Sequence, residues 1–371
     1  MGFSVPARVP PVLSRPTLGG RAAPSGPLRQ HRGRRDAQLP LAPHLVRAWC
    51  RDYAAAPYQE WTARNRTAGG VDLQTGHAYG EIILALQAEF ERHPEYYPLI
   101  DGRRKPGKEA KLCIGNEELR RLVVAYRVEK LRKRPALASV SVDPSDGGGW
   151  CECEKCRALG SISDRVAILA NEVAAAVGAE SPGKLVGLYA YNHHSPAPSV
   201  RIAPNVVVSV ATAFLHGDQT VEEIMDGWGR QGAVLGVREY YAVNTWDRDQ
   251  PAQSRGANLA YLSRTIPGFH ARGARFMSAE SSDNWGPNGL GYYIASRLLW
   301  DVRQAQRVPE LVDDFLARAF GPARSRCGSS TRSSMGPVRT SVSTTGRPHV
   351  PRAGPGEGAC RPCRRRAGAP G

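Results

Sequence analysis

The sequence predicts an α/β fold, namely a (β/α) TIM-barrel-like arrangement that is incomplete and is flanked by disordered Arg-, Pro- and Gly-rich tails. Short apolar segments alternate with amphipathic helical segments, which is typical of parallel strands buried on both faces. Polar residues follow the ends of several of these strands, where a barrel carries its functional loops. Five strands are clear and one more could precede His77, whereas a complete barrel has about eight.

The charge of the chain is concentrated at its two ends. The 371 residues carry a formal net charge of +16. Residues 1–50 contribute +7 and residues 322–371 contribute +9, all of it from arginine, so the middle is neutral. A nucleic-acid-binding fold would place basic residues on a structured face among aromatic residues. No nucleic-acid partner is therefore expected.

The low-complexity composition of the ends predicts the domain limits. We expect residues 1–57 and 322–371 to be disordered tails, because they lack the apolar residues needed to offset ordering, and residues 58–321 to form the barrel domain. A signal peptide needs a continuous apolar stretch of roughly 7–15 residues. None is readable at this start, which leaves the localisation unknown. No apolar run approaches the ~20 residues of a membrane span.

Apolar periodicity locates the elements of the middle region. The strands are expected at Ala138–Val142, Leu185–Ala190, Val206–Val210, Ala233–Val237 and Arg275–Ser278. The helices are expected at Glu81–Arg92, from Asn116 onward, and at Asp164–Val177, Val221–Trp228, Asn258–Ile266, Leu290–Trp300 and Val308–Phe320. No glycine-rich phosphate-binding motif follows any strand, which disfavours a nucleotide-binding protein.

The segment that follows the strand Ala138–Val142 carries the strongest functional signal. It reads DPSDGGGWCECEKC and holds two carboxylates, a glycine loop, Trp150 and three cysteines. Polar residues follow the later strands as well. In a barrel, all of these would meet at the carboxyl edge of the sheet.

The three cysteines form a C-x-C-x-x-C motif. A structural zinc site needs four ligands, so a fourth would come from His193, His194 or Cys113. A disulfide with one free thiol, or C-x-x-C redox chemistry, are the alternatives. We expect a structural site that fixes the loop, with metal or disulfide left open, and no cofactor required for chemistry. The candidate metal ligands are Cys151, Cys153 and Cys156.

Four stretches together resemble a bacterial domain-of-unknown-function family, DUF4838. They are SVDPSDGGGWCECEKC, the upstream HPEYYPLIDGRR and KLCIGNEELRRLVV, and the downstream GARFMSAESSDNWGPNGLGYYIASRLLWD. The resemblance covers about residues 76–321. It implies a glycoside-hydrolase-like TIM barrel and a carbohydrate ligand, and the relatives suggest an exported protein. The oligomeric state is not predicted.

Glycoside hydrolysis usually needs two carboxylates, and four candidates follow the predicted strands. In some hexosaminidase-type enzymes an acidic pair instead assists attack by the acetamido group of the substrate. We expect Glu239 or Glu280 to act as acid or base, with Asp143 and Asp146 as partner carboxylates. Asp146 precedes a glycine and is readily explained as a turn residue that caps backbone N–H groups, and Glu239 could instead form an ion pair with arginine residues of an adjacent strand.

Aromatic and polar side chains near the same loops are candidates for binding a sugar. Aromatic rings stack on the C–H faces of sugars, although packing that anchors the loops explains them about as well. For His77, a hydrogen bond to backbone is the plainer explanation. The candidates are His77, Trp150, Tyr191, Asn192, His193, Tyr240 and Trp285.

The sequence therefore supports three functions. The first is a glycoside hydrolase acting on an acetamido- or uronic-acid-containing glycan. The second is a carbohydrate-binding or inactive barrel that keeps the groove without the chemistry. The third is a metal-stabilised interaction module built on the cysteine loop.

Overall fold

The structure is a computed structural model that describes residues 43–45, 73–242, 254–281 and 285–325. Most of the two predicted tails lies outside these residues, so the predicted domain limits stay a prediction. Within the described ranges, no helix is both long and apolar enough to cross a membrane.

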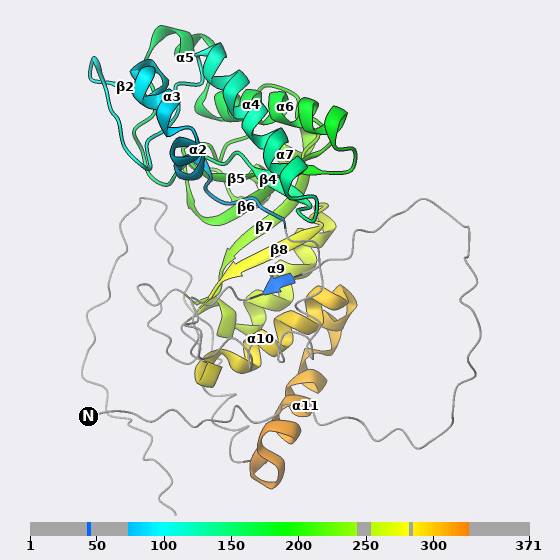
Figure 1. The fold of residues 1–371 in the computed structure, drawn as a ribbon. Coiled ribbons are helices and arrows are strands. Elements are labelled where there is room, and N and C mark those ends of the chain that lie inside the picture. The colour runs from blue at the N-terminus through cyan, green and yellow to red at the C-terminus, as the bar shows by residue number, and fades with distance from the viewer. Residues whose placement is uncertain (1–42, 46–72, 243–253, 282–284, 326–371) are drawn as a thin grey trace, which may run out of the picture.

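A single parallel sheet forms the centre of the fold (Figure 1). Its strand order is β1-β8-β7-β6-β5-β4, and every neighbouring pair is parallel. The strands are β1 (Pro43–Leu45), β4 (Ser139–Ser141), β5 (Leu185–Asn192), β6 (Val206–Leu215), β7 (Val234–Tyr240) and β8 (Phe276–Glu280). Consecutive strands are neighbours, and the first strand lies beside the last, as in the wall of a barrel. The mixed α/β, half-barrel fold confirms the predicted fold class.

Helices follow the strands and cover the outer face of the sheet (Figure 1). The longer helices are α4 (Glu117–Lys133), α6 (Ile162–Glu180), α7 (Val221–Arg230), α9 (Leu259–Ala271), α10 (Trp285–Trp300) and α11 (Val308–Phe320). Before α4 lie α2 (Tyr79–Ala85), α3 (Gln87–Arg92), η2 (Pro94–Tyr96) and a hairpin of β2 (Leu99–Ile100) and β3 (Arg103–Arg104). The short elements α5 (Glu154–Ala158), η3 (Arg255–Ala257), η4 (Val302–Arg307) and η5 (Gly321–Ala323) complete the fold.

Local sequence explains where the main helices begin. The Asn116 side chain accepts a hydrogen bond from the Leu119 N–H at the start of α4. Both α6 and α7 begin with a capping box, formed by Ser161 with Asp164 and by Thr220 with Glu223. Each box satisfies backbone groups that a helix end leaves unpaired.

The two faces of the sheet have opposite character because side chains alternate along a strand. On β5, Val186, Leu188 and Ala190 are fully buried on the helix-covered face. Tyr189 and Tyr191 alternate with them and lie on the inner face. The extended segment 73–77 runs along β4 on this inner side, where a Cβ at Gly187 would lie 2.0 Å from the Gln74 carbonyl oxygen. Glycine is therefore required at position 187 for this close approach.

All five predicted strands are present, but two details of the prediction are wrong. Within the N-terminal region, residues 43–45 form β1, which adds to the edge of the sheet beside β8. The helix expected at Glu81–Arg92 is divided at Leu86 into α2 and α3. The strand suggested before His77 amounts to one parallel bridge, between His77 and Asp143.

Candidate functional site

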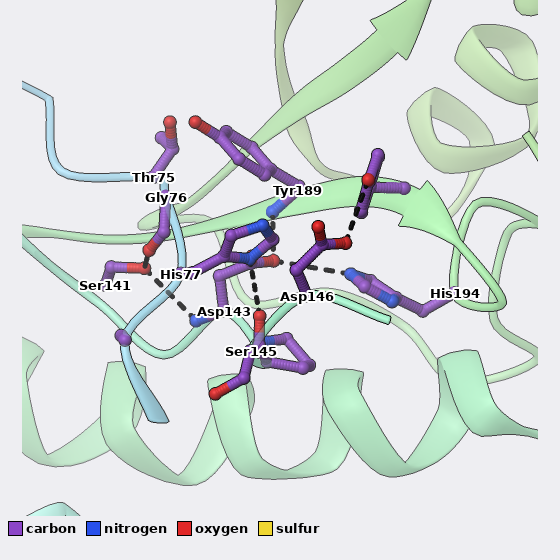
Figure 2. Close-up of polar contacts among 12 residues, drawn as sticks. Thr75, Gly76, His77, Ser141, Asp143, Ser145, Asp146, Tyr189 and His194 are labelled. Carbon is purple, nitrogen blue, oxygen red and sulfur yellow. Dashed lines mark hydrogen bonds and ion pairs between the residues drawn. The ribbon is translucent and has the colours of Figure 1, made fainter. Parts of the chain in front are cut away.

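The candidate site lies on the inner face of the sheet at its carboxyl edge. Strand β4 ends at Ser141, and Pro144 prevents the strand from continuing because proline has no N–H for the ladder. Asp143 is thereby placed at the strand end, beside His77 of the adjoining segment. Figure 2 shows His77, Asp143, Asp146 and His194 gathered at this point.

Asp143 is the centre of a buried hydrogen-bond network. The carboxylate is 0% exposed. Its Oδ2 lies 2.7 Å from Nδ1 of His77, and its Oδ1 accepts a 2.7 Å hydrogen bond from the Tyr189 backbone N–H (Figure 2). The same Oδ1 lies 3.3 Å from Nε2 of His194. The Asp143 carboxylate is thus enclosed by its partners, an arrangement that suits a group orienting His77 and His194.

The same hydrogen-bond network shifts the pKa values of Asp143 and His77. Burial opposes ionisation of Asp143, but the hydrogen bonds from His194 and His77 outweigh it and hold the pKa of the carboxyl below its usual value. Burial lowers the pKa of His77, but the hydrogen bond and the negative charge of Asp143 outweigh it and raise that pKa above its usual value. Because Nδ1 of His77 is held by Asp143, Nε2 is the ring nitrogen left for proton exchange. The His77 side chain is 34% exposed.

We expect His77→Gln to remove a component of the pH dependence of stability. A raised pKa means that protonated His77 stabilises the fold fully below its unfolded pKa of about 6.5, and that this contribution is lost as the pH rises through the higher folded pKa. Urea unfolding at a series of rising pH values that begins below the unfolded pKa should therefore show a decline in the stability of the wild type, and this decline should be smaller in the variant. Equal declines would contradict the pairing of His77 with Asp143.

The loop at residues 144–149 is held in place by Lys111. This lysine is buried, and its Nζ donates to the backbone carbonyls of Ser145 and Asp146. The ammonium also lies 5.0 Å from the centre of the Trp150 ring. Burial lowers the pKa of Lys111 to about 8, despite the nearby charges of Asp143 and Asp146.

Asp146 projects from this loop toward the inner face. Its Oδ1 accepts a 2.9 Å hydrogen bond from the Tyr191 hydroxyl and a 2.7 Å hydrogen bond from the Gly147 N–H. Burial and the hydrogen bond to Asp146 raise the pKa of Tyr191, so the phenol stays protonated and donates. The Gly147 contact confirms the turn role considered for Asp146, and the Tyr191 contact adds a link to the sheet.

Aromatic rings cover the inner face between the ends of β5, β6 and β7. The ring centres of Tyr191 and Phe214 lie 5.9 Å apart, and those of Phe214 and Tyr240 lie 5.6 Å apart. Phe214 is half-exposed and has a φ of +55°, which L-residues other than glycine rarely adopt. Strained backbone of this kind clusters at functional sites.

Glu280 stands at the far side of this aromatic row. Its Oε2 accepts a 2.9 Å hydrogen bond from Arg238, and the side chain is 35% exposed. The Arg238 guanidinium also lies 5.6 Å from the centre of the Tyr240 ring. The inner face thus carries Asp146 at one side of the tyrosines and Glu280 at the other.

The expectation that Glu239 shares a pocket with Glu280 is wrong. Glu239 pairs across the sheet with Ala279, whereas Glu280 pairs with Tyr240, so the two glutamates lie on opposite faces. Glu239 is 0% exposed and accepts hydrogen bonds from the Tyr261 hydroxyl of α9 and the Tyr240 N–H. An arginine also lies 3.7 Å from this carboxylate, but it is Arg255 of η3 and not a residue of an adjacent strand.

The other predicted binding residues lie at the edge of the site. Asn192 ends β5 with a φ of +48°. The ring of His193 stacks on His216 at 4.8 Å, and burial with the charge of His216 lowers the pKa of His193. Trp150 packs edge-on against His194 at 5.7 Å. Trp285 is the first residue of α10, and its side chain lies outside the described residues.

The structure brings Cys113 to the three cysteines of the motif. The sulfur atoms of the four cysteines all lie within 4.8 Å of one another, which is close enough to hold a metal ion. The four cysteines are free thiols, so the disulfide alternative is not seen among them. Neither His193 nor His194 supplies the fourth group, because His194 contacts Asp143 instead and His193 stacks on His216.

Four residues of the site were missed by the sequence analysis as binding or positioning groups: Lys111, Tyr189, Phe214 and Arg238. Alternation from Tyr191 and Tyr240 would have placed Tyr189 and Arg238 on the inner face. No local signal separates Lys111 from the other lysines, because its partners are 34 and 35 residues away.

Fold and site together define a barrel-like protein with carboxylates and aromatic residues at the carboxyl edge of a parallel sheet. The sequence profile described as "Domain of unknown function (DUF4838)" matches residues 30–327. The chain belongs to this family, which confirms the resemblance. No curated protein matches the chain.

Several solved structures are similar to the chain at low identity. A mutant O-GlcNAc hydrolase of Thermobaculum terrenum is 12% identical with a TM-score of 0.47, covering 82% of this chain and 69% of the other. A chitinase-like agglutinin of Robinia pseudoacacia is 13% identical with a TM-score of 0.37, covering 67% and 87%. An α-galactosidase of Geobacillus stearothermophilus is 10% identical with a TM-score of 0.32, covering 58% and 29%.

Proposed function

We propose that the protein is a glycoside hydrolase that acts on an acetamido- or uronic-acid-containing glycan at the inner face of the carboxyl edge. The observation that carries the proposal is the placement of Asp146 and Glu280 on either side of the row formed by Tyr191, Phe214 and Tyr240. Two carboxylates beside an aromatic surface suit the hydrolysis of a stacked sugar, because glycoside hydrolases usually act through a pair of carboxylates and aromatic rings pack on sugar faces.

The neighbouring groups suit distinct roles for the two carboxylates. Glu280 is ion-paired with Arg238 at 2.9 Å, and a carboxylate in that position suits a base, a nucleophile or a stabiliser of positive charge on the sugar ring. Asp146 is held by Tyr191 on a loop beside His77, whose raised pKa favours the protonated form of the imidazole. Arg238 and the imidazole of His77 also suit a sugar bearing a carboxylate or a polar acetamido group.

A second candidate function is carbohydrate binding without hydrolysis. Two observations favour it: Glu280 is already ion-paired with Arg238, and Asp143 is enclosed by its partners. In that case the tyrosines would bind a sugar while no carboxylate pair acts on it.

One experiment separates the two functions. The full chain is incubated with aryl glycosides of N-acetylhexosamines and of uronic acids, alongside the Asp146→Asn/Glu280→Gln double variant. Release of the aryl group by the wild type above the rate of the variant supports the hydrolase. Saturable binding of the free sugars by calorimetry without release, weakened by Tyr191→Ala, supports the binding protein. The absence of both aryl release and sugar binding would contradict both functions.

We infer that the cysteine cluster has a structural role outside the reaction. Cys113, Cys151 and Cys156 are buried. Four sulfur ligands would complete the coordination of a bound zinc ion, whereas a catalytic metal needs an open position. The cluster therefore suits a structural role.

A further inference from the structure

The four clustered cysteines have the spacing of a tetrahedral metal site. The sulfur of Cys113 lies 3.6 Å from that of Cys151, 3.6 Å from that of Cys153 and 3.9 Å from that of Cys156. Zinc–sulfur bonds of about 2.3 Å in a tetrahedron place the sulfurs about 3.8 Å apart. We propose that these four cysteines bind one structural zinc ion.

The surroundings of the sulfurs suit thiolates. The Leu99 N–H donates to the sulfur of Cys151 at 3.2 Å, and the Gly115 N–H donates to that of Cys156 at 3.1 Å. The Arg104 guanidinium hydrogen-bonds the Cys113 side chain. Such N–H donors and a nearby cation stabilise the negative charge that four thiolates on one zinc ion would leave.

The backbone around the cluster is shaped to bring the ligands together. Gly115, two residues after Cys113, approaches the start of α5 so closely that a Cβ would lie 2.6 Å from the backbone nitrogen of Cys156. Only glycine permits this approach. Thus the C-x-G turn at Cys113 and the C-x-x-C turn at Cys153 face each other, which a pair of zinc-binding turns requires.

The proposed zinc ion would join two segments that flank the candidate site. One is the segment leading to α4, which carries Lys111, and the other is residues 150–156, which continue the loop bearing Asp146. An effect of zinc on hydrolysis rests on the proposed function, whereas the binding of zinc does not. The test therefore measures the metal itself.

The full chain, purified under reducing conditions without added chelator, is expected to contain about one zinc per chain by elemental analysis. A Cys360→Ser/Cys363→Ser variant is the control, because it removes the other C-x-x-C pair of the sequence, and it should keep the zinc. Cys113→Ser is expected to lose most of it. Zinc that remains in Cys113→Ser but disappears from the control would overturn the proposal.

A second measurement covers the case in which Cys113→Ser fails to fold. Cobalt(II) exchanged into the wild type should give the sulfur-to-cobalt charge-transfer absorption and the intense visible bands of a tetrahedral thiolate site. Absence of these bands, with the thiols reduced and cobalt in excess, would overturn the proposal. So would iron in place of zinc in the purified protein. Metal binding without any glycan hydrolysis would leave this proposal standing and count against the proposed function.

Discussion

Asp146→Asn is expected to lower kcat/KM for the glycan that the wild type cleaves by about 100- to 10,000-fold, the range typical of acid–base groups. Asparagine keeps the size of the side chain and still accepts the hydrogen bonds from Tyr191 and Gly147. It removes only the charge and the exchangeable proton. The loss should therefore appear mainly in kcat, with KM changed little.

The matched control is Glu180→Gln, which removes an exposed carboxylate at the end of α6, just before β5 begins. That position belongs to the amino edge of the sheet, opposite the candidate site. Its kcat/KM should equal that of the wild type. Wild-type activity in Asp146→Asn would remove Asp146 from the reaction and leave Glu280 without a partner on the inner face.

Asp143→Ala is expected to lower the free energy of unfolding by about 3–5 kcal/mol at neutral pH, because removing one partner of a buried charged network leaves the others unpaired. The substitution takes the acceptor from the Tyr189 N–H, from His194 and from His77. Urea or thermal unfolding measures the loss. Asp218→Ala, at an exposed carboxylate after β6, should change stability by less than about 0.5 kcal/mol.

The loss of stability caused by Asp143→Ala should become smaller as the pH falls. The pKa of Asp143 is lower in the folded state than in the unfolded state. Its contribution is therefore present above the unfolded pKa of about 3.9 and fades as the pH falls through the folded pKa. The difference between wild type and Asp143→Ala should shrink under acid conditions. A difference that grows in acid would contradict the charged state assigned to Asp143.

The positions of the strands could be predicted from the sequence because each contains a compact apolar run. The run before Asp143-Pro144 forms β4 as expected, whereas the run Val206–Val210 forms only the first half of β6, which continues to Leu215. The loop with Asp143 and Asp146 could be placed at the carboxyl edge for the same reason. The sequential strand order is what the expected TIM-barrel-like arrangement implies.

The sequence did not show which face of the sheet each side chain at a strand end occupies, because a shift of one residue exchanges the two faces. Glu239 and Glu280 both end strands, yet only Glu280 shares the inner face with Tyr240. Contacts between residues far apart in the sequence could not be predicted either. Cys113 joins the C-x-C-x-x-C motif across about 40 residues, and the sequence offered His193 and His194 as equal alternatives.

A crystal structure of the Asp146→Asn variant, soaked with N-acetylglucosamine and, separately, with glucuronate, would show directly whether the inner face binds a sugar. We expect a sugar ring within stacking distance of Tyr191, Phe214 or Tyr240, with Glu280 facing its anomeric carbon. A sugar bound elsewhere on the molecule, or an inner face left empty by a sugar that binds in solution, would contradict this expectation.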